Sequence, residues 1–340
     1  MPFDNENILL ERTTTVPELI TIQQELAERC RGTVRLQESM SAHTTFRTGG
    51  PADYFLTPVD EDDLVTMLQI LRQADIPVKV IGNGSNILVS DLGIRGAVIR
   101  LKPGFAQIER EGEVIIAGAG ALLWQVTKFA AAHDLSGLES TMGIPGTIGG
   151  ALVMNAGTDH GSISEMVVSA TVVDTAGNVQ VKDHGNLGFK YRESSLLGSG
   201  QIVISSRLQL TPGSPQEIQD KMERLKQKRT SRQPTDCRTA GSTFKNPEVY
   251  IDGKQQAAGK LIDQAGAKGW HIGGAEVSQK HANFIIAKPG ATSADIRSLA
   301  EWMRQRVLDE KGHYLAMEIE FLGDWTGWVK QTVALPPENI

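Results

Sequence analysis

Gly143-Ile144-Pro145-Gly146-Thr147-Ile148-Gly149-Gly150 is the stretch of this sequence that says most about its fold, and a second glycine-rich stretch, Gly82-Asn83-Gly84-Ser85-Asn86, directly follows a short apolar run. Glycine lets backbone N–H groups approach phosphate oxygens closely, so loops of this kind form anion-binding nests. One such loop alone more often marks a tight turn, because turns are the commonest use of glycine. Two of them in one region, with hydroxyl or amide side chains between the glycines, predict a cradle for a pyrophosphate.

The two loops do not match the best-known nucleotide-binding motifs. The run from Gly82 to Gly84 lacks the third glycine of the Rossmann fingerprint at the required offset. Neither loop ends in glycine, lysine and a serine or threonine, as a Walker A loop does. A dinucleotide held by these loops would therefore belong to a different fold.

The chain has 340 residues, enough for two or three domains, and a formal net charge of −6. The acidic surplus argues against general nucleic-acid binding, which needs a basic field, but allows a small anionic substrate in a local basic pocket. Cys30 and Cys237 make neither a disulfide framework nor a metal site, and the histidines lack metal-ligand spacing. The acidic N-terminus lacks a secretory pattern, and no apolar run could span a bilayer. We therefore expect a cytoplasmic protein with no metal and no membrane or nucleic-acid partner.

Periodicity and capping residues predict a mixture of helices and strands. A helix is expected at residues 16–31, and Asp60 is placed to cap a second one. Ser214 has capping-box spacing and opens a charged helix that reaches about Arg232, while Thr292 is expected to cap a helix that ends at Gly312. The other expected elements are strands at 77–81, 114–118, 167–174, 201–210, 283–287 and 315–322, and helices at 122–130 and 257–267.

Ser242 lies in the segment Ala240–Pro247, where a lysine and an amide follow the hydroxyl closely. A serine usually needs a histidine base to act as a nucleophile, and no histidine is near it in sequence. Another role, such as proton donor, is therefore open to this serine. A hydroxyl that fills a turn after Gly241 is the commoner use of serine, and the residues alone leave both interpretations standing.

Several motifs in order along the chain resemble those of the UDP-N-acetylenolpyruvoylglucosamine reductases, flavoenzymes of peptidoglycan synthesis. The motifs are Arg47-Thr48-Gly49-Gly50-Pro51-Ala52, the two glycine loops, Tyr191-Arg192-Glu193-Ser194, Ala240–Pro247 and Gly312–Gly323. The resemblance implies an α+β fold with a two-part FAD-binding unit of the vanillyl-alcohol oxidase-like (PCMH) type and a C-terminal α+β substrate-binding domain. The boundaries expected from it are a lead-in at 1–45, the FAD-binding domain at 46–212, the substrate-binding domain at 213–323 and a tail at 324–340.

The resemblance also implies FAD as cofactor and NADPH as co-substrate, for reduction of the enolpyruvyl group of UDP-N-acetyl-3-O-(1-carboxyvinyl)-glucosamine to UDP-N-acetylmuramate. Pro51 stands where some flavoproteins of this fold carry a histidine that attaches FAD covalently, so non-covalent FAD is expected. The short stretch after Tyr191 resembles the branch of the family that lacks a substrate-covering tyrosine loop, and a monomer is expected. The implied FAD contacts are Arg47, Gly82, Asn83, Gly84, Ser85, Asn86, Gly143, Gly146, Thr147, Ile148, Gly149 and Gly150.

Three catalytic positions are implied by the resemblance. Arg192 would face the substrate carboxylate, because a guanidinium keeps its charge and can pair with both carboxylate oxygens. Ser242 would give a proton to the α-carbon after hydride reaches the β-carbon. Glu318 would stabilise the intermediate or orient the acid, although the family usually has Glu-Pro where this chain has Ala316-Met317. Glu320 shares a strand face with Glu318, and counting back from Gly323 favours Glu318.

On the substrate side, the resemblance points to Lys245, Asn246, Lys268 and His281. A lysine can neutralise a diphosphate, and an asparagine can hydrogen-bond sugar or phosphate oxygens. A lone histidine is more often structural than functional. The basic run Lys226, Lys228, Arg229 and Arg232 is expected to be a solvated helix end, with reception of an anionic nucleotide as the alternative.

Two other functions stay open on the sequence. One is a flavin oxidoreductase of the same fold that acts on a sugar or hydroxy acid with oxygen as acceptor. It shares the glycine loops but gives no reason for Ala240–Pro247 or Tyr191–Ser194. The other is a nucleotide-sugar binding or regulatory protein without turnover, which the departure at Ala316-Met317 keeps open.

Overall fold

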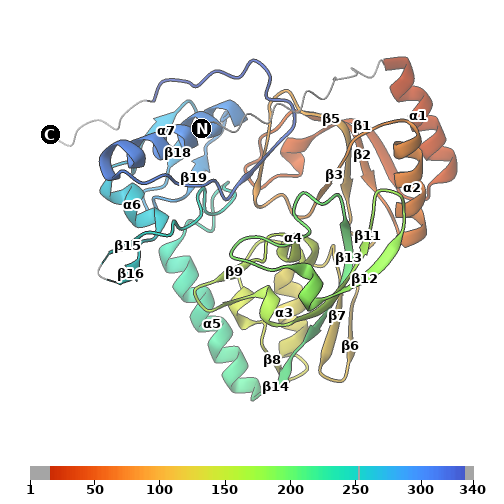
Figure 1. Cartoon of the computed structure of the whole chain (residues 1–340), viewed down its shortest axis with the longest axis horizontal. Helices are drawn as coiled ribbons and strands as arrows, with labels where there is room; N and C mark the ends of the chain where they lie inside the picture. The colour runs from red at the N-terminus through yellow and green to blue at the C-terminus, as the bar shows by residue number, and fades with distance from the viewer. Residues whose placement is uncertain (1–15, 252, 334–340) are drawn as a thin grey trace.

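The computed structural model describes residues 16–251 and 253–333; residues 1–15 of the expected lead-in and 334–340 of the expected tail lie outside the described residues. Two sheet units and a smaller C-terminal unit surround the middle of the molecule (Figure 1). The first unit is a four-stranded sheet whose N-terminal strand pairs antiparallel with its neighbour, while the other strands pair in parallel. Its strands, in spatial order, are β1 (Thr33–Ser39), β2 (Pro51–Thr57), β5 (Ile94–Arg100) and β3 (Val78–Ile81).

Helices α1 (Val16–Arg29) and α2 (Glu61–Gln73) lie together on the outer side of this sheet (Figure 1). The Asp60 carboxylate accepts the N–H of Asp63 at 3.0 Å, so the expected cap of α2 is confirmed. The residues that repeat at helical spacing are buried, namely Leu64, Met67, Leu68 and Leu71. Because β1 precedes residue 45 and pairs with β2 after it, the expected lead-in contributes a strand to the sheet.

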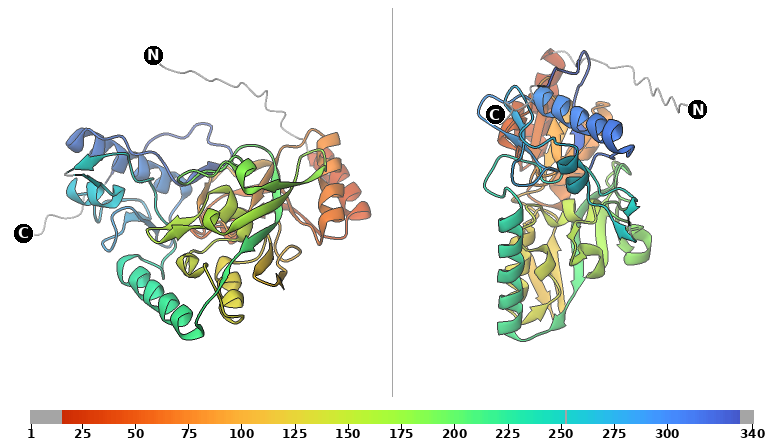
Figure 2. Two further views of the ribbon diagram at one scale, coloured as in Figure 1. Left: turned by 60° about the horizontal axis from the view of Figure 1, so that its bottom comes forward. Right: turned by 90° about the vertical axis from the view of Figure 1, so that its left-hand side faces the viewer.

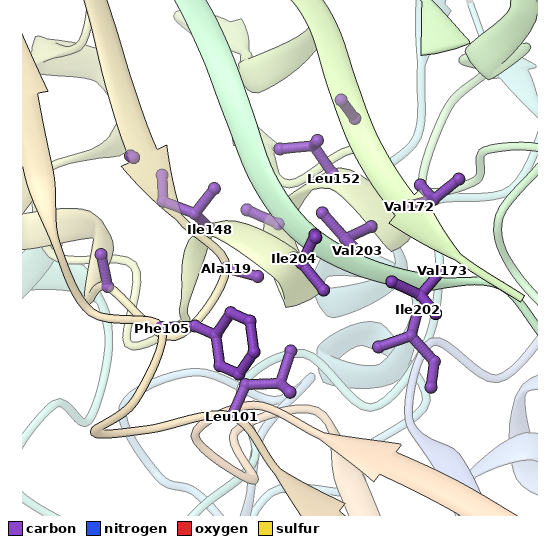
Figure 3. Close-up of a cluster of buried hydrophobic side chains, with 14 of the residues drawn as sticks. Leu101, Phe105, Ala119, Ile148, Leu152, Val172, Val173, Ile202, Val203 and Ile204 are labelled. Carbon is purple, nitrogen blue, oxygen red and sulfur yellow. The ribbon is translucent and has the colours of Figure 1, made fainter. Parts of the chain in front are cut away.

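The second unit is a five-stranded antiparallel sheet. Its strands, in spatial order, are β12 (Val179–Asp183), β11 (Val167–Val173), β13 (Ile202–Gln209), β7 (Val114–Gly118) and β6 (Ile108–Glu111). Helix α4 (Ile148–Val153) packs on this sheet, and Figure 3 shows its Ile148 and Leu152 gathered with Ile202, Val203 and Ile204 of β13. Helix α3 (Leu123–Ala131) completes the unit, with the short pairs β8 (Leu135–Ser136) with β14 (Thr211–Pro212) and β9 (Gly157–Thr158) with β10 (Gly161–Ser162).

Helix α5 (Pro215–Arg232) runs along the second unit and leads to the C-terminal one (Figure 2). Ser214 caps it and Pro215 is its first residue, as expected. Thr292 and Gly312 bound α7 (Ser293–Lys311), which also confirms the predicted ends. The C-terminal unit further contains β15 (Tyr250–Ile251), β16 (Lys254–Gln255), α6 (Ala258–Gln264), β17 (His271–Ile272), β18 (Ala275–Val277) and β19 (Ile285–Ala287).

The strand expected at 315–322 is wrong as one continuous element. Its first half hydrogen-bonds to the segment after Ser242, since Lys245 N donates to Ala316 O at 2.9 Å and Glu318 N to Thr243 O at 2.8 Å. Its second half is β20 (Glu320–Leu322), which pairs in parallel with β4 (Ile87–Val89) of the first unit. A strand can change partners where no single neighbour runs along its whole length, and this one does so at the buried Ile319.

Residues after Gly323 pack back on α7. The guanidinium of Arg297 lies 4.6 Å from the ring centre of Trp325 and 4.0 Å from that of Trp328, which are cation–π distances. Trp302 of α7 donates its indole N–H to Gln331 O at 2.7 Å. The described part of the expected tail is therefore a packed extension. Among the described residues, no helix combines the length and apolar character needed to cross a membrane.

Candidate functional site

A cavity of about 820 Å³ opens between the three units. Its lining brings together residues that are far apart in sequence: the first glycine loop, most of the second, Arg192, Ser242 and Glu318. A volume of this size is typical of pockets that hold an organic ligand. The cavity is therefore the site to which the sequence motifs converge.

The two glycine loops touch one another at the cavity wall. Asn83 donates its side-chain N–H to Pro145 O at 3.0 Å. A Cβ on Gly82 would lie 2.5 Å from the hydroxyl oxygen of Thr147, so any larger residue would separate the loops. Gly84 has a φ of +64°, and a Cβ there would lie 2.0 Å from His43 O. The two loops need these glycines because their backbones approach other residues too closely for a side chain. The small residues also leave the backbone N–H groups of the loops accessible to a ligand, which fits a dinucleotide such as FAD.

Arg192 projects into the cavity from the connection between β12 and β13. Its Nε donates to Glu318 Oε1 at 2.9 Å, and one Nη donates to Gly157 O at 2.8 Å. The side chains of the ion pair are only 20% and 15% exposed, so the pair is mostly shielded from water. Arg192 has a backbone φ of +55°, which is an uncommon conformation for a residue other than glycine. Such a conformation often marks a functional position, because surrounding structure must hold it in place.

Burial raises the pKa of Glu318 above its ordinary value. The positive charges of Arg192 and Lys245 act in the opposite direction, and burial outweighs them. Both the backbone N–H and the carbonyl of Glu318 are held, the latter by the side-chain amide of Asn86 at 2.9 Å. Glu318 is thus a fixed carboxyl group that can gain or hold a proton next to Arg192.

The backbone that follows Ser242 is held by hydrogen bonds, whereas the Ser242 hydroxyl makes none to another described residue. The next residues are clamped by Asn283, whose backbone O accepts from Thr243 N at 2.8 Å and whose side chain exchanges two hydrogen bonds with the backbone of Phe244. No hydrogen bond joins the Ser242 hydroxyl to another described residue. His281 lines the same cavity, and its Nδ1 accepts from Asn283 N at 3.3 Å; among the described residues it makes no hydrogen bond to Ser242.

Helix α5 contributes cations that the sequence pattern assigned to solvent. Lys226 and Arg232 are exposed, as expected of a solvated helix end, whereas Lys228 and Arg229 are partly buried; Lys228, Arg229 and Arg232 also line the cavity. The Nε of Arg229 is buried and has no hydrogen-bond partner among the described residues. Burial lowers the pKa of Arg229, and the nearby positive charge of Arg192 lowers it further. Two guanidinium groups that face one cavity are suited to an anion.

The sequence analysis did not expect the burial of Arg229, although it gave reception of an anionic nucleotide as the alternative for the basic run that contains this residue. The helix that carries it is charged on most sides, so hydrophobic periodicity gives no sign that one of its arginines is enclosed. Its side chain packs under the second glycine loop, where a Cβ on Gly143 would lie 3.0 Å from Arg229 Cδ. Lys228 is held beside it by a 2.8 Å hydrogen bond to His160 Nε2.

The other expected substrate and cofactor residues are distributed as follows. Asn246 lines the cavity, and its side-chain oxygen accepts from Ala258 N at 3.0 Å. Lys245 is close enough to influence Glu318, although it does not line the cavity. Lys268 pairs with Asp263 at 2.8 Å, also away from the lining. Arg47 is exposed outside the lining, and Gly143 and Ile148 do not line the cavity either.

No group of three or more potential metal ligands occurs within residues 16–251 and 253–333.

The chain is similar to known proteins over most of its length. Residues 52–182 match the family model of an FAD binding domain, and residues 233–322 match that of the UDP-N-acetylenolpyruvoylglucosamine reductase C-terminal domain. The UDP-N-acetylenolpyruvoylglucosamine reductase of Caldanaerobacter subterraneus is 42% identical over 86% of this chain and 95% of its own length. That of Rhodopseudomonas palustris is 44% identical over 92% and 98%.

A solved structure agrees with this result. The UDP-N-acetylenolpyruvylglucosamine reductase of Thermus caldophilus superimposes with a TM-score of 0.72 at 36% identity, covering 86% of this chain and 99% of its own. The expected resemblance and the expected fold class, an FAD-binding unit followed by a C-terminal α+β domain, are both confirmed.

The raised pKa of Glu318 predicts a dependence of stability on pH. A native carboxyl with a raised pKa binds its proton more tightly than in the unfolded chain, so wild-type protein loses stability as pH rises from the ordinary value through the raised one. Glu318→Gln removes this titration. Arg192 then lacks its partner, but because a guanidinium stays charged over this range, this loss changes the unfolding free energy of the variant by the same amount at every pH. The unfolding free energy of the variant minus that of wild type should therefore increase over this pH range.

Urea denaturation of the cofactor-free protein from about pH 4 to 8 measures this difference, since a free glutamate titrates near 4.3. Glu28→Gln, at an exposed position of α1, should give a flat difference. A difference for Glu318→Gln that decreases with pH would show that Arg192 dominates and that the pKa is lowered.

Proposed function

This chain belongs to the UDP-N-acetylenolpyruvoylglucosamine reductase family, and we propose that it reduces the enolpyruvyl group of UDP-N-acetyl-3-O-(1-carboxyvinyl)-glucosamine to UDP-N-acetylmuramate for peptidoglycan synthesis. Non-covalently bound FAD would supply the redox chemistry, taking a hydride from NADPH and delivering it to the β-carbon of the substrate. The observation that carries the proposal is that two glycine loops, the Arg192–Glu318 pair and the free hydroxyl of Ser242 share one cavity.

Arg192 is proposed to bind the substrate carboxylate. Glu318 and Gly157 occupy two of its nitrogen atoms and orient the guanidinium. The remaining Nη has no hydrogen bond to another described residue, so it is available to a carboxylate in the cavity. Negative charge that develops on the α-carbon and its carboxylate would be stabilised there, and a water-poor site strengthens the effect.

Ser242 is proposed to donate the proton that completes the reduction. Its hydroxyl hydrogen is not committed to a described acceptor, and its backbone is clamped through Asn283. A rigid position favours proton transfer at a defined distance. Glu318, fixed and with a raised pKa, would keep Arg192 in place and support the charge balance of the same step.

The UDP diphosphate is proposed to lie against α5. Arg229 has an unpartnered buried Nε, and Lys228 and Arg232 line the same cavity. A diphosphate would relieve the repulsion between Arg229 and Arg192 and supply the missing hydrogen-bond acceptor. Asn246 lies beside them and can bond a sugar or phosphate oxygen. Lys245, Lys268 and His281 for the substrate, and Arg47 for FAD, are proposed on the family resemblance; of the four, His281 lines the cavity.

We further propose a monomer in the cytoplasm, organised as an FAD-binding domain at 46–212, to whose first sheet β1 of the lead-in adds a strand, and a substrate-binding domain at 213–323. The matched segments 52–182 and 233–322 fall inside these two ranges and support the division.

A spectroscopic titration tests the activity. The purified protein should be yellow, NADPH should bleach its flavin absorbance in the absence of oxygen, and the enolpyruvyl UDP-sugar should restore the colour. Mass spectrometry should then find UDP-N-acetylmuramate. Recolouring by oxygen and a simple sugar at the same rate would favour a flavin oxidase instead. A colourless protein that binds the UDP-sugar would favour a binding protein without turnover.

Ser242→Ala separates the two halves of the reaction. Loss of the proton donor should slow flavin reoxidation by the substrate about 10²–10⁴-fold, while flavin reduction by NADPH stays near the wild-type rate. Stopped-flow absorbance measures both half-reactions. Ser41→Ala, outside the cavity, is the matched control and should leave both rates unchanged. Near-normal reoxidation in Ser242→Ala would falsify its role as the acid.

Arg229→Met tests the diphosphate site. Loss of charge-assisted hydrogen bonds should raise the dissociation constant of the UDP-sugar about 10- to 100-fold, since one such bond contributes roughly 1.5–3 kcal/mol. Calorimetric titration of the FAD-bound enzyme measures this constant. Arg224→Met changes an exposed arginine of the same helix and should have no effect. Equal affinities in both variants would rule out Arg229 as a phosphate ligand.

A further inference from the structure

Glu320 is an acidic side chain in the cavity that the proposed reaction does not use. It follows Glu318 by two residues, so both carboxyl groups point to the same side of the chain and line the same cavity. Glu318 is paired with Arg192, whereas Glu320 forms no ion pair with another described residue. Its side chain is exposed, yet surrounding protein raises its pKa by desolvation. The two observations agree if Glu320 faces the hollow of the cavity rather than the outer surface.

The position of Glu320 lies between the two functional parts of the cavity. Its backbone N–H donates to Asn86 O at 3.0 Å, at the end of the first glycine loop, and it stands opposite Ile87 in the β20–β4 pair. Two residues earlier, Glu318 accepts a hydrogen bond from Arg192, and its backbone N–H donates to Thr243 O, next to Ser242. Glu320 therefore lines the cavity between the end of the first glycine loop and the Glu318–Arg192 pair.

Lys79 provides an opposite charge in the lining of the same cavity. It belongs to β3, and the whole strand lines the cavity. Its positive charge opposes the effect of burial on the pKa of Glu320. Lys79 makes no salt bridge with another described residue. Both charges therefore line one cavity without an ion-pair partner among the described residues.

We propose that Glu320 and Lys79 are tuning residues that face the bound flavin and set its reduction potential. The inference rests on the proposed FAD site. Two-electron reduction adds negative charge to the ring unless protons follow, so an adjacent carboxylate disfavours the reduced state and an adjacent ammonium favours it. FAD would also exclude water from both groups, which strengthens their effect on its ring.

The test measures the midpoint potential of the FAD-bound protein by equilibration with a reference dye. Glu320→Gln should raise the ratio of reduced to oxidised flavin about tenfold at a fixed potential, which is about 30 mV for a two-electron couple. Lys79→Met should lower the ratio by a similar factor. Glu109→Gln, an exposed carboxyl on β6 outside the cavity, is the matched control and should leave the potential unchanged.

An unchanged or lowered potential in yellow Glu320→Gln protein would overturn the inference, even if the enzyme still turns over. If the Glu320→Gln protein does not retain FAD, the Lys79→Met protein becomes the test of the inference. An unchanged or raised midpoint potential in Lys79→Met would then overturn the inference. A colourless wild-type protein would instead contradict the proposed FAD site itself. Flavin absorbance of each purified variant, recorded before the titration, distinguishes these results.

Discussion

The site depends on one stretch of backbone that is shared between two parts of the protein. Residues 316–318 hydrogen-bond to the segment 243–245, and β20 then pairs with β4. This arrangement sets Ser242, Glu318 and the first glycine loop at fixed distances, because backbone hydrogen bonds on both sides leave the stretch no freedom to slide. Glu318 directly precedes Ile319, where the partner changes, and its carboxyl group reaches Arg192 of the second unit.

A second attachment keeps the C-terminal unit against the first sheet. The carboxylate of Asp91, just after β4, accepts the N–H groups of Ser293 and Ala294 at 2.9 and 2.8 Å. These are free donors at the start of α7, where a negative charge is also favoured by the helix dipole. The hydroxyl of Ser293 reaches Thr48 of the paired-glycine motif at 2.9 Å. The cavity is therefore bounded by units that are joined at two places, which favours a preformed site over one assembled by the ligand.

The sequence predicted those parts of the fold that depend on residues close together in the chain, such as the starts of helices. Asp60, Ser214 and Thr292 cap the helices they were expected to cap, since a capping side chain and its N–H lie within three residues of each other. The partner change at Ile319 was not predictable, because it depends on strands more than 70 and 230 residues away in sequence. The burial of Arg229 was not predictable for a related reason: it comes from a glycine loop that precedes this residue by 86 positions, and nothing in its own helix reflects that contact.

The pairing of β20 with β4 has a consequence for how the protein is made. Asn86 and Glu318, which share a hydrogen bond, are separated by 232 positions, so the first glycine loop leaves the ribosome long before its partner strand exists. At about 5–20 residues per second this interval lasts on the order of 10–50 seconds. During that time the edge of β4 that later receives β20 is unpaired, and such edges invite contacts with other chains. A nascent chain of this protein therefore carries an incomplete cofactor cradle, and it gains its full binding cavity only when the last strand arrives.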